Sequence, residues 1–125
     1  MIGYVDAGYL FDPHKAKSQT GYVFTNNGTT ISWHFQKQTF LATFSNHSEI
    51  IALHEASREC VWIRSMTHHI KESYGFSVNK SPTILYEDNA ACISQLRKGY
   101  IKSHRTKHIP PRLFSYTHEL IKTIT

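Results

Sequence analysis

Hydrophobic and polar positions alternate with a period of two near the start of the chain. Over Ile2–Leu10 apolar side chains occupy both faces of this pattern, which predicts a strand that is buried on both sides and central in its sheet. Two runs rich in β-branched and aromatic residues, Gly21–Asn26 and Thr29–Phe35, flank the dipeptide Asn27-Gly28. An Asn-Gly pair between such runs predicts a β-hairpin with a two-residue turn.

The hydrophobic period lengthens to three or four residues in the second third of the chain. Apolar residues recur at these steps over Glu49–Ile70, which predicts a long amphipathic helix. Pro82 then introduces a predicted strand at Thr83–Glu87, and Asn89–Arg97 has the pattern of a short helix. Two prolines at positions 110 and 111 predict the start of a last helix. Its apolar side comprises Leu113, Phe114, Leu120 and Ile121.

This order of elements predicts an α/β fold with a mixed sheet and flanking helices. Three strands are expected to pair antiparallel, and the long helix makes a right-handed crossover to a fourth strand parallel to the first. The 125 residues suffice for a single domain, residues 1–125, with one core. No apolar run approaches the roughly 20 residues of a membrane span, so we expect no membrane association.

The composition adds a basic balance to this picture. A net charge of +5, with nine histidines besides, favours a polyanionic partner such as a nucleic acid. Cys60 and Cys92 lie in predicted helices without metal-site spacing, so we expect two reduced core thiols. The first residues lack a positive region followed by an apolar block. We therefore expect an intracellular protein, in the cytoplasm or nucleus, that is not secreted.

Three acidic residues interrupt this pattern within or beside predicted elements. Asp6 lies within the central strand, where an unpaired ionised carboxylate costs several kcal/mol. We therefore expect Asp6 to bind a cation or to lie at the open rim of a site, and the alternative is a buried salt bridge. Glu49 begins the long helix, either as the capping-box partner of Asn46 or, because it falls on the apolar stripe, as a site residue. Asp88 and Asn89 both precede the short helix. Either can cap it, which leaves the other free.

The predicted topology brings these three acids together. The first and fourth strands are neighbours if the crossover is right-handed, and the long helix begins near the same end of the sheet. Three converging carboxylates repel one another unless divalent cations neutralise them, and carboxylate oxygens suit Mg²⁺. We therefore predict that Asp6, Glu49 and Asp88 are metal ligands. Two ions about 3.5–4 Å apart would activate a water molecule and stabilise the departing oxygen of a phosphodiester.

A basic segment, RKGYIKSHRTKHIPPR, follows the predicted short helix without an interrupting acid. It is either a phosphate-contacting surface beside the acids or a solvated polar loop. On the first interpretation, residues of this segment contact the nucleic acid together with Asn89 and two lysines of the first loop. The predicted contacts are Lys15, Lys17, Asn89, Arg97, Lys98, Lys102, His104, Arg105 and Lys107.

Six motifs together resemble a known family. GYVDAGY, KSQTGYVF, TTISW, SEIIAL, LYEDNAA and RTKHI follow one another in the order of the ribonuclease H domain of Ty1/copia-type retrotransposon polyproteins, especially the branch of plant genomes. The resemblance covers nearly the whole chain. It implies the ribonuclease H fold, cleavage of the RNA strand of RNA/DNA hybrids, and Mg²⁺, with Mn²⁺ as a substitute. It also implies an Asp-Glu-Asp-Asp ligand set, whose first three members fall on Asp6, Glu49 and Asp88.

We find no counterpart of the fourth acid of that set in this sequence. In the family it follows one more strand, whereas the single acid after Asp88 here is Glu119, on the predicted last helix. We therefore expect a sheet that lacks the usual fifth strand and last helix. The exposed edge at Thr83–Glu87 would then favour a homodimer. The alternative function is a truncated, weakly active or inactive remnant that binds nucleic acid or protein.

Overall fold

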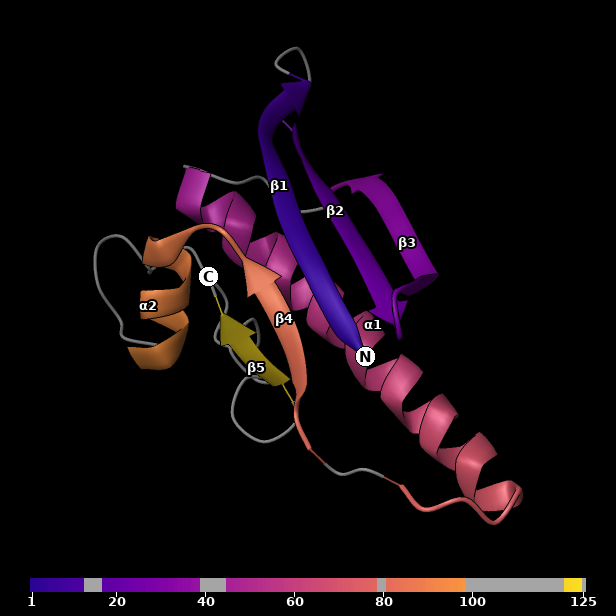
Figure 1. Ribbon diagram of the computed structural model, residues 1–125. Coiled ribbons are helices and arrows are strands. Elements are labelled where there is room, and N and C mark those ends of the chain that lie inside the picture. The colour runs from indigo at the N-terminus through magenta and orange to yellow at the C-terminus, as the bar shows by residue number, and fades with distance from the viewer. Residues whose placement is uncertain (13–16, 39–44, 79–80, 99–120, 125) are drawn as a thin grey trace.

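The structure, a computed structural model, describes residues 1–12, 17–38, 45–78, 81–98 and 121–124 (Figure 1). Its elements are β1 (Ile2–Asp12), β2 (Lys17–Asn26), β3 (Thr29–Lys37), α1 (Ser45–Ser73), β4 (Thr83–Glu87), α2 (Ala90–Lys98) and β5 (Ile121–Ile124). The five strands form one sheet in the order β3-β2-β1-β4-β5. This arrangement confirms the predicted α/β fold with three antiparallel strands and a parallel fourth.

Strand β1 lies at the centre of the sheet, as its two apolar faces predicted. It pairs antiparallel with β2 and, over Ile2–Val5, parallel with β4, so both edges of β1 are paired along this segment. The hairpin between β2 and β3 is also confirmed. Its turn residues Asn27 and Gly28 have φ angles of 51° and 79°, and two positive φ values are typical of a type I′ turn.

Helix α1 forms the crossover between β3 and β4 and covers one face of the sheet (Figure 1). The hydrophobic core lies between them and includes Phe24 and Leu85 from the sheet and Leu53 from the helix, all of them fully buried. Gly3 sits between the side chains of Phe24 and Leu85, where a Cβ atom would overlap both. The two cysteines are free and buried, as predicted for core thiols.

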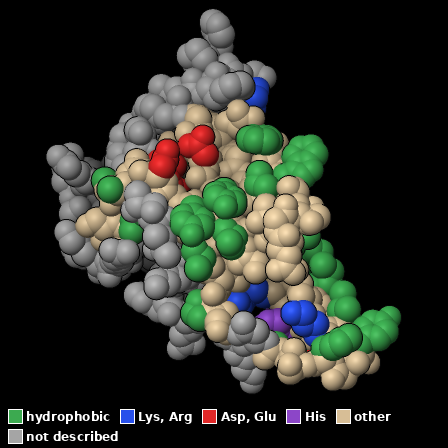
Figure 2. All heavy atoms as spheres, viewed as in Figure 1, with side chains coloured by type: hydrophobic (Ala, Val, Ile, Leu, Met, Phe, Trp, Pro, Cys, Tyr) green, Lys and Arg blue, Asp and Glu red, His purple; other side chains and the backbone are tan. Residues whose placement is uncertain are grey.

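The opposite face of the sheet carries exposed aromatic side chains. Tyr4 and Tyr86 are partners across β1 and β4, and their rings stack with centroids 5.4 Å apart. Trp33 and Phe35 project from the edge strand β3 and are largely exposed. In Figure 2 these hydrophobic side chains form a broad green area across the middle of this face.

The structure corrects three expectations. A fifth strand is present, because β5 pairs parallel with β4, and Ile121 therefore lies in a strand rather than in a last helix. The edge of β4 is thus covered, so the premise of the homodimer is wrong, although the dimer itself stays a prediction. Helix α1 begins at Ser45, which places Asn46 inside the first turn and not at the N-cap position. No helix among the described residues is long and apolar enough to cross a membrane.

Candidate metal centre

The acids gather where β1 and β4 separate. The two strands pair from Ile2 and Ile84 up to Val5 and Glu87, after which β4 ends and the chain turns toward α2, while β1 continues alongside β2. Asp6 and Asp88 are the first residues beyond this pairing. In open α/β sheets, ligands commonly bind in such a fork at the carboxyl ends of parallel strands.

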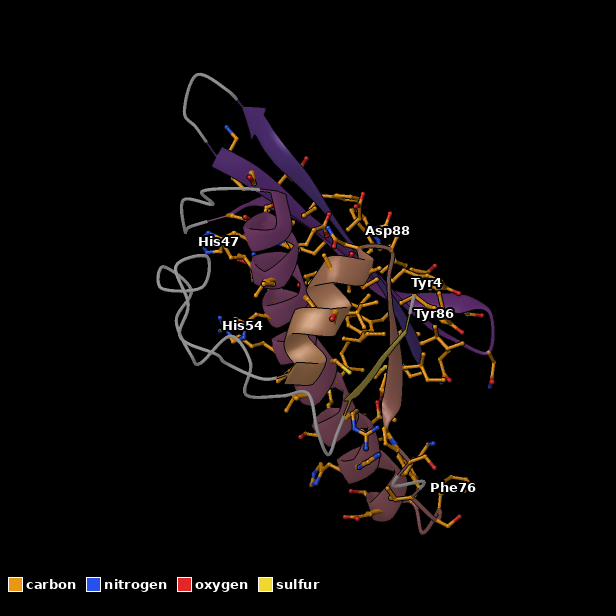
Figure 3. All side chains as sticks on the ribbon, turned by 90° about the vertical axis from the view of Figure 1, so that its left-hand side faces the viewer. Tyr4, His47, His54, Phe76, Tyr86 and Asp88 are labelled. Carbon is orange, nitrogen blue, oxygen red and sulfur yellow. The ribbon has the colours of Figure 1, made fainter. Side chains whose placement is uncertain are left out.

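Glu49 enters the fork from the first turns of α1. One carboxylate oxygen each from Asp6, Glu49 and Asp88 lies within 4.8 Å of the other two. Asp6 and Asp88 are exposed, whereas Glu49 is only 8% exposed. Figure 2 shows red acidic side chains side by side on this face, and Figure 3 places Asp88 at the end of β4, above Tyr86. The predicted convergence of the three carboxylates is therefore confirmed.

The electrostatics of Glu49 suit a cation. Burial raises the pKa of Glu49 to about 7; a hydrogen bond with Glu87 lowers it in part, and the negative charges of Asp6 and Asp88 raise it further. Its Oε2 atom is buried and has no hydrogen-bond partner among the described residues. A buried carboxylate oxygen without a partner is costly unless a cation binds it. The three oxygens span little more than the diameter of one Mg²⁺ coordination sphere, about 4.2 Å, so these residues fit a magnesium site.

Glu87 is a fourth acid of this cluster that the sequence analysis missed. It is 1% exposed, and burial together with the charge of Glu49 raises its pKa to about 9, so it is protonated at neutral pH. Its carboxyl group lies against that of Glu49 and can donate a hydrogen bond to it. The signal was present in the period of the strand, because Thr83, Leu85 and Glu87 alternate onto the buried face.

Asn89 resolves which residue caps α2. Its side-chain Oδ1 accepts the backbone N–H of Cys92 at 2.9 Å, and its own backbone N–H donates to Glu87 Oε1 at 3.1 Å. Asn89 is thus the N-cap through its side-chain oxygen, and the predicted contact of Asn89 with a nucleic acid stays a prediction. Asp88 has no part in capping and is free to face the other acids.

Gln38, also missed by the sequence analysis, fixes the start of α1. This fully buried side chain donates from Nε2 to Thr20 Oγ1 at 3.0 Å and to the Ser48 carbonyl oxygen at 2.9 Å. Its backbone N–H donates to the Ser18 carbonyl oxygen at 2.9 Å. Gln38 therefore ties β2 to the residue that precedes Glu49, and so determines where that carboxylate lies.

The predicted basic contacts lie largely beyond what the structure describes. Lys17 belongs to β2, and Arg97 and Lys98 belong to α2, but only their backbones are described. The remaining predicted contacts lie outside the described residues, namely Lys15, Lys102, His104, Arg105 and Lys107. A phosphate-contacting surface beside the acids stays a prediction.

Comparison with known proteins gives two informative similarities, whereas no family model matches the chain. The Retrovirus-related Pol polyprotein from transposon TNT 1-94 of Nicotiana tabacum is 31% identical over 112 residues, which are 90% of this chain and 8% of that protein. Secreted RxLR effector protein 161 of Plasmopara viticola is 38% identical over 71 residues, which are 57% of this chain. The chain spans about half the length of the effector.

These similarities correct one expectation and support another. The expected intracellular, non-secreted location is contradicted by the similarity to a protein that is named as a secreted effector. The similarity to the TNT 1-94 polyprotein extends over nine tenths of the chain. The chain is similar to part of a retrotransposon Pol polyprotein, and this similarity supports an origin in such a polyprotein.

Proposed function

We propose that this chain is a ribonuclease H, a metal-dependent endonuclease that hydrolyses the RNA strand of RNA/DNA hybrids. The observation that carries the proposal is the convergence of Asp6, Glu49 and Asp88 at the fork between β1 and β4. The similarity to a retrotransposon polyprotein supports a retroelement-derived domain. A carboxylate cluster at this position of an α/β sheet suits divalent-metal chemistry on phosphate esters.

Asp6, Glu49 and Asp88 would hold Mg²⁺, for which Mn²⁺ is a substitute. The bound metal would supply an activated water molecule and stabilise the oxygen that leaves phosphorus. In the balanced reaction, water adds to phosphorus, one P–O bond of the RNA strand breaks, and the leaving oxygen takes up a proton.

Separate residues of the protein would bind the metal and the nucleic acid. Asp6 and Asp88 are exposed and can be reached by a scissile phosphate, whereas buried Glu49 is held by its helix and by the contact with Glu87. Cations of the basic segment, Arg97–Arg112, would contact the phosphates of the hybrid. Recognition of a hybrid runs mainly through phosphates and 2′-hydroxyl groups, so we expect little sequence preference.

Cleavage of a labelled RNA/DNA hybrid in Mg²⁺ or Mn²⁺ tests this proposal. We expect cleavage of the RNA strand by the unmodified protein and a loss of at least about a hundredfold in Asp6→Asn, because the charge that binds metal is removed. Glu72→Gln is the matched control, since it removes an exposed carboxylate at the far end of α1. Equal rates for the unmodified protein and Asp6→Asn would end the enzyme proposal.

A second candidate is a non-cleaving module that binds nucleic acid or protein. It is favoured by the similarity to a secreted effector, which matches more than half of this chain. The two candidates differ in one outcome of the same experiment. Hybrid binding without any metal-dependent cleavage would support the second candidate and exclude the first.

A further inference from the structure

A basic hollow lies at the end of the sheet opposite the acids. It is formed where the start of β1, the β2–β3 hairpin, the last turns of α1 and the approach to β4 meet. The described residues that line it are Met1, Asn26, Asn27, Ile31, Arg64, Thr67, His68, Lys71, Ser81, Pro82 and Thr83. Figure 2 shows blue and purple basic side chains gathered in a depression low on this face.

Arg64 gives the hollow a fixed cation. Its Nη1 atom donates to the Ser81 carbonyl oxygen and to Thr83 Oγ1, each at 2.8 Å. Thr83 is buried at the start of β4, so these bonds hold the guanidinium in place. Because both bonds use Nη1, the Nη2 and Nε groups keep their donor capacity for a ligand.

Lys71 and His68 add basic side chains that have no partner among the residues that the structure describes. They follow Arg64 by seven and four residues, so all three share one face of α1. Neither side chain has a hydrogen bond or ion pair with any described residue, and none of the described lining residues is acidic. Positive groups that line a concavity without a counter-charge create a field that attracts anions.

The hollow is large enough to hold a small molecule rather than a single ion. Its volume of about 490 Å³ falls within the range of small-molecule pockets, about 300–1,000 Å³. Apolar side chains of Met1, Ile31 and Pro82 line part of the wall, and the amides of Asn26 and Asn27 line another part. The anionic group of a ligand would contact the basic side chains of α1, and the uncharged remainder of the same ligand would contact this mixed wall.

We propose that the basic hollow binds a small phosphorylated ligand of about mononucleotide size. The phosphate lies against Arg64, His68 and Lys71, because a guanidinium and an ammonium both form charge-assisted hydrogen bonds with phosphate oxygens. This site is separate from the acidic cluster. Asp6 follows Met1 by five positions along β1, which corresponds to roughly 17 Å of extended chain.

Calorimetric titration of the full chain with adenosine monophosphate, inorganic phosphate and adenosine tests the proposal. We expect the monophosphate to bind more tightly than phosphate, and adenosine to bind at least about tenfold more weakly than the monophosphate. Lys71→Ala should weaken binding of the monophosphate by about tenfold or more. Arg58→Ala is the matched control, because it removes an exposed cation of α1 that does not line the hollow.

Two results would overturn the proposal. One is equal affinity of adenosine and its monophosphate; the other is monophosphate binding that Lys71→Ala and Arg58→Ala leave equally unchanged. An oligonucleotide without terminal phosphates distinguishes a second source of phosphate: if it alone binds through Lys71, the small-ligand proposal fails. Asp6→Asn should leave monophosphate binding intact, so failure of hybrid cleavage and failure of this site are separate outcomes.

Discussion

At the scale of single residues, the site combines two exposed and two buried carboxyl groups. Asp6 and Asp88 are exposed to water, whereas burial raises the pKa of Glu49 to about 7 and that of Glu87 to about 9. The two buried groups therefore differ in role. Glu49 changes protonation state near neutral pH and can become a ligand, while Glu87 remains a neutral donor beside it.

Magnesium binding should depend on pH through Glu49. A proton competes with the ion below about pH 7, so affinity should rise about tenfold per pH unit up to that value and then level off. Titration calorimetry at several pH values measures this effect. Glu49→Gln should bind weakly at every pH. Affinity that stays constant between about pH 5.5 and about pH 8 would contradict the role given to Glu49.

Glu87 should make the metal-free protein less stable as pH rises. Its pKa is raised from 4.5 to about 9, so between these values the folded protein holds a proton that the unfolded chain has released. The free energy of unfolding therefore falls as pH rises through this window. Glu87→Gln should remove much of this decrease in the free energy of unfolding. At alkaline pH the variant should be more stable than the unmodified protein by about 1–3 kcal/mol. Urea unfolding curves measure this, and parallel pH profiles would refute it.

At the scale of elements, local patterns identify most of the sheet. The alternation around Ile2–Leu10, the Asn27-Gly28 turn and the long amphipathic stretch each specify their own structure, because the period and the turn residues are local properties. Strand β5 was missed for the opposite reason. Its four residues carry too short a pattern, and they form a strand by pairing with β4, a contact that only the tertiary structure supplies.

The packing between β1, β2 and β4 makes Gly3 essential. A Cβ atom there would overlap Leu85 Cδ2 and lie 2.6 Å from Phe24 Cε1, and both of these side chains are fully buried. Gly3→Ala should therefore lower the free energy of unfolding by about 1–3 kcal/mol. Thermal and urea denaturation measure the change. An unaltered midpoint in both experiments would show that the core accommodates the methyl group.

The link between β2 and α1 should depend on Gln38. Gln38→Ala leaves the Ser48 carbonyl and Thr20 hydroxyl without their buried donor, which should cost about 1–3 kcal/mol. Mg²⁺ affinity should also fall, because Glu49 follows Ser48. Gln36→Ala is the matched control, since Gln36 is exposed and makes a long 3.4 Å bond to Glu55. Equal stability of the Gln38→Ala and Gln36→Ala variants would contradict the proposed role of Gln38 in positioning α1.

At the scale of the whole molecule, opposite chemistry occupies the two ends of the central strands. Carboxylates gather beyond the last paired residues of β1 and β4, whereas Arg64, His68 and Lys71 gather near their first residues. Figure 3 places Tyr4, Tyr86 and Asp88 on one side of the molecule and His47 and His54 on the other. The two candidate sites therefore lie at opposite ends of the paired segment of β1 and β4, and each includes residues of α1.

The sequence predicted the acidic cluster better than its surroundings. Asp6 and Asp88 directly follow the paired segments of two strands whose parallel pairing follows from the crossover rule, so their meeting was predictable. Gln38 was not identified because its role depends on Thr20 and Ser48, which are distant in sequence. The basic hollow was missed for the same reason, since its lining comes from four separate segments.

The most direct test of the central claim is a titration with Mn²⁺, in which the electron paramagnetic resonance signal of the free ion reports binding. The unmodified protein and the Glu72→Gln control should bind the ion with equal affinity. Asp6→Asn, Glu49→Gln and Asp88→Asn should each weaken binding by about tenfold or more, because each removes a charged ligand. Equal Mn²⁺ affinity in all five proteins would contradict a metal site built from these three carboxylates.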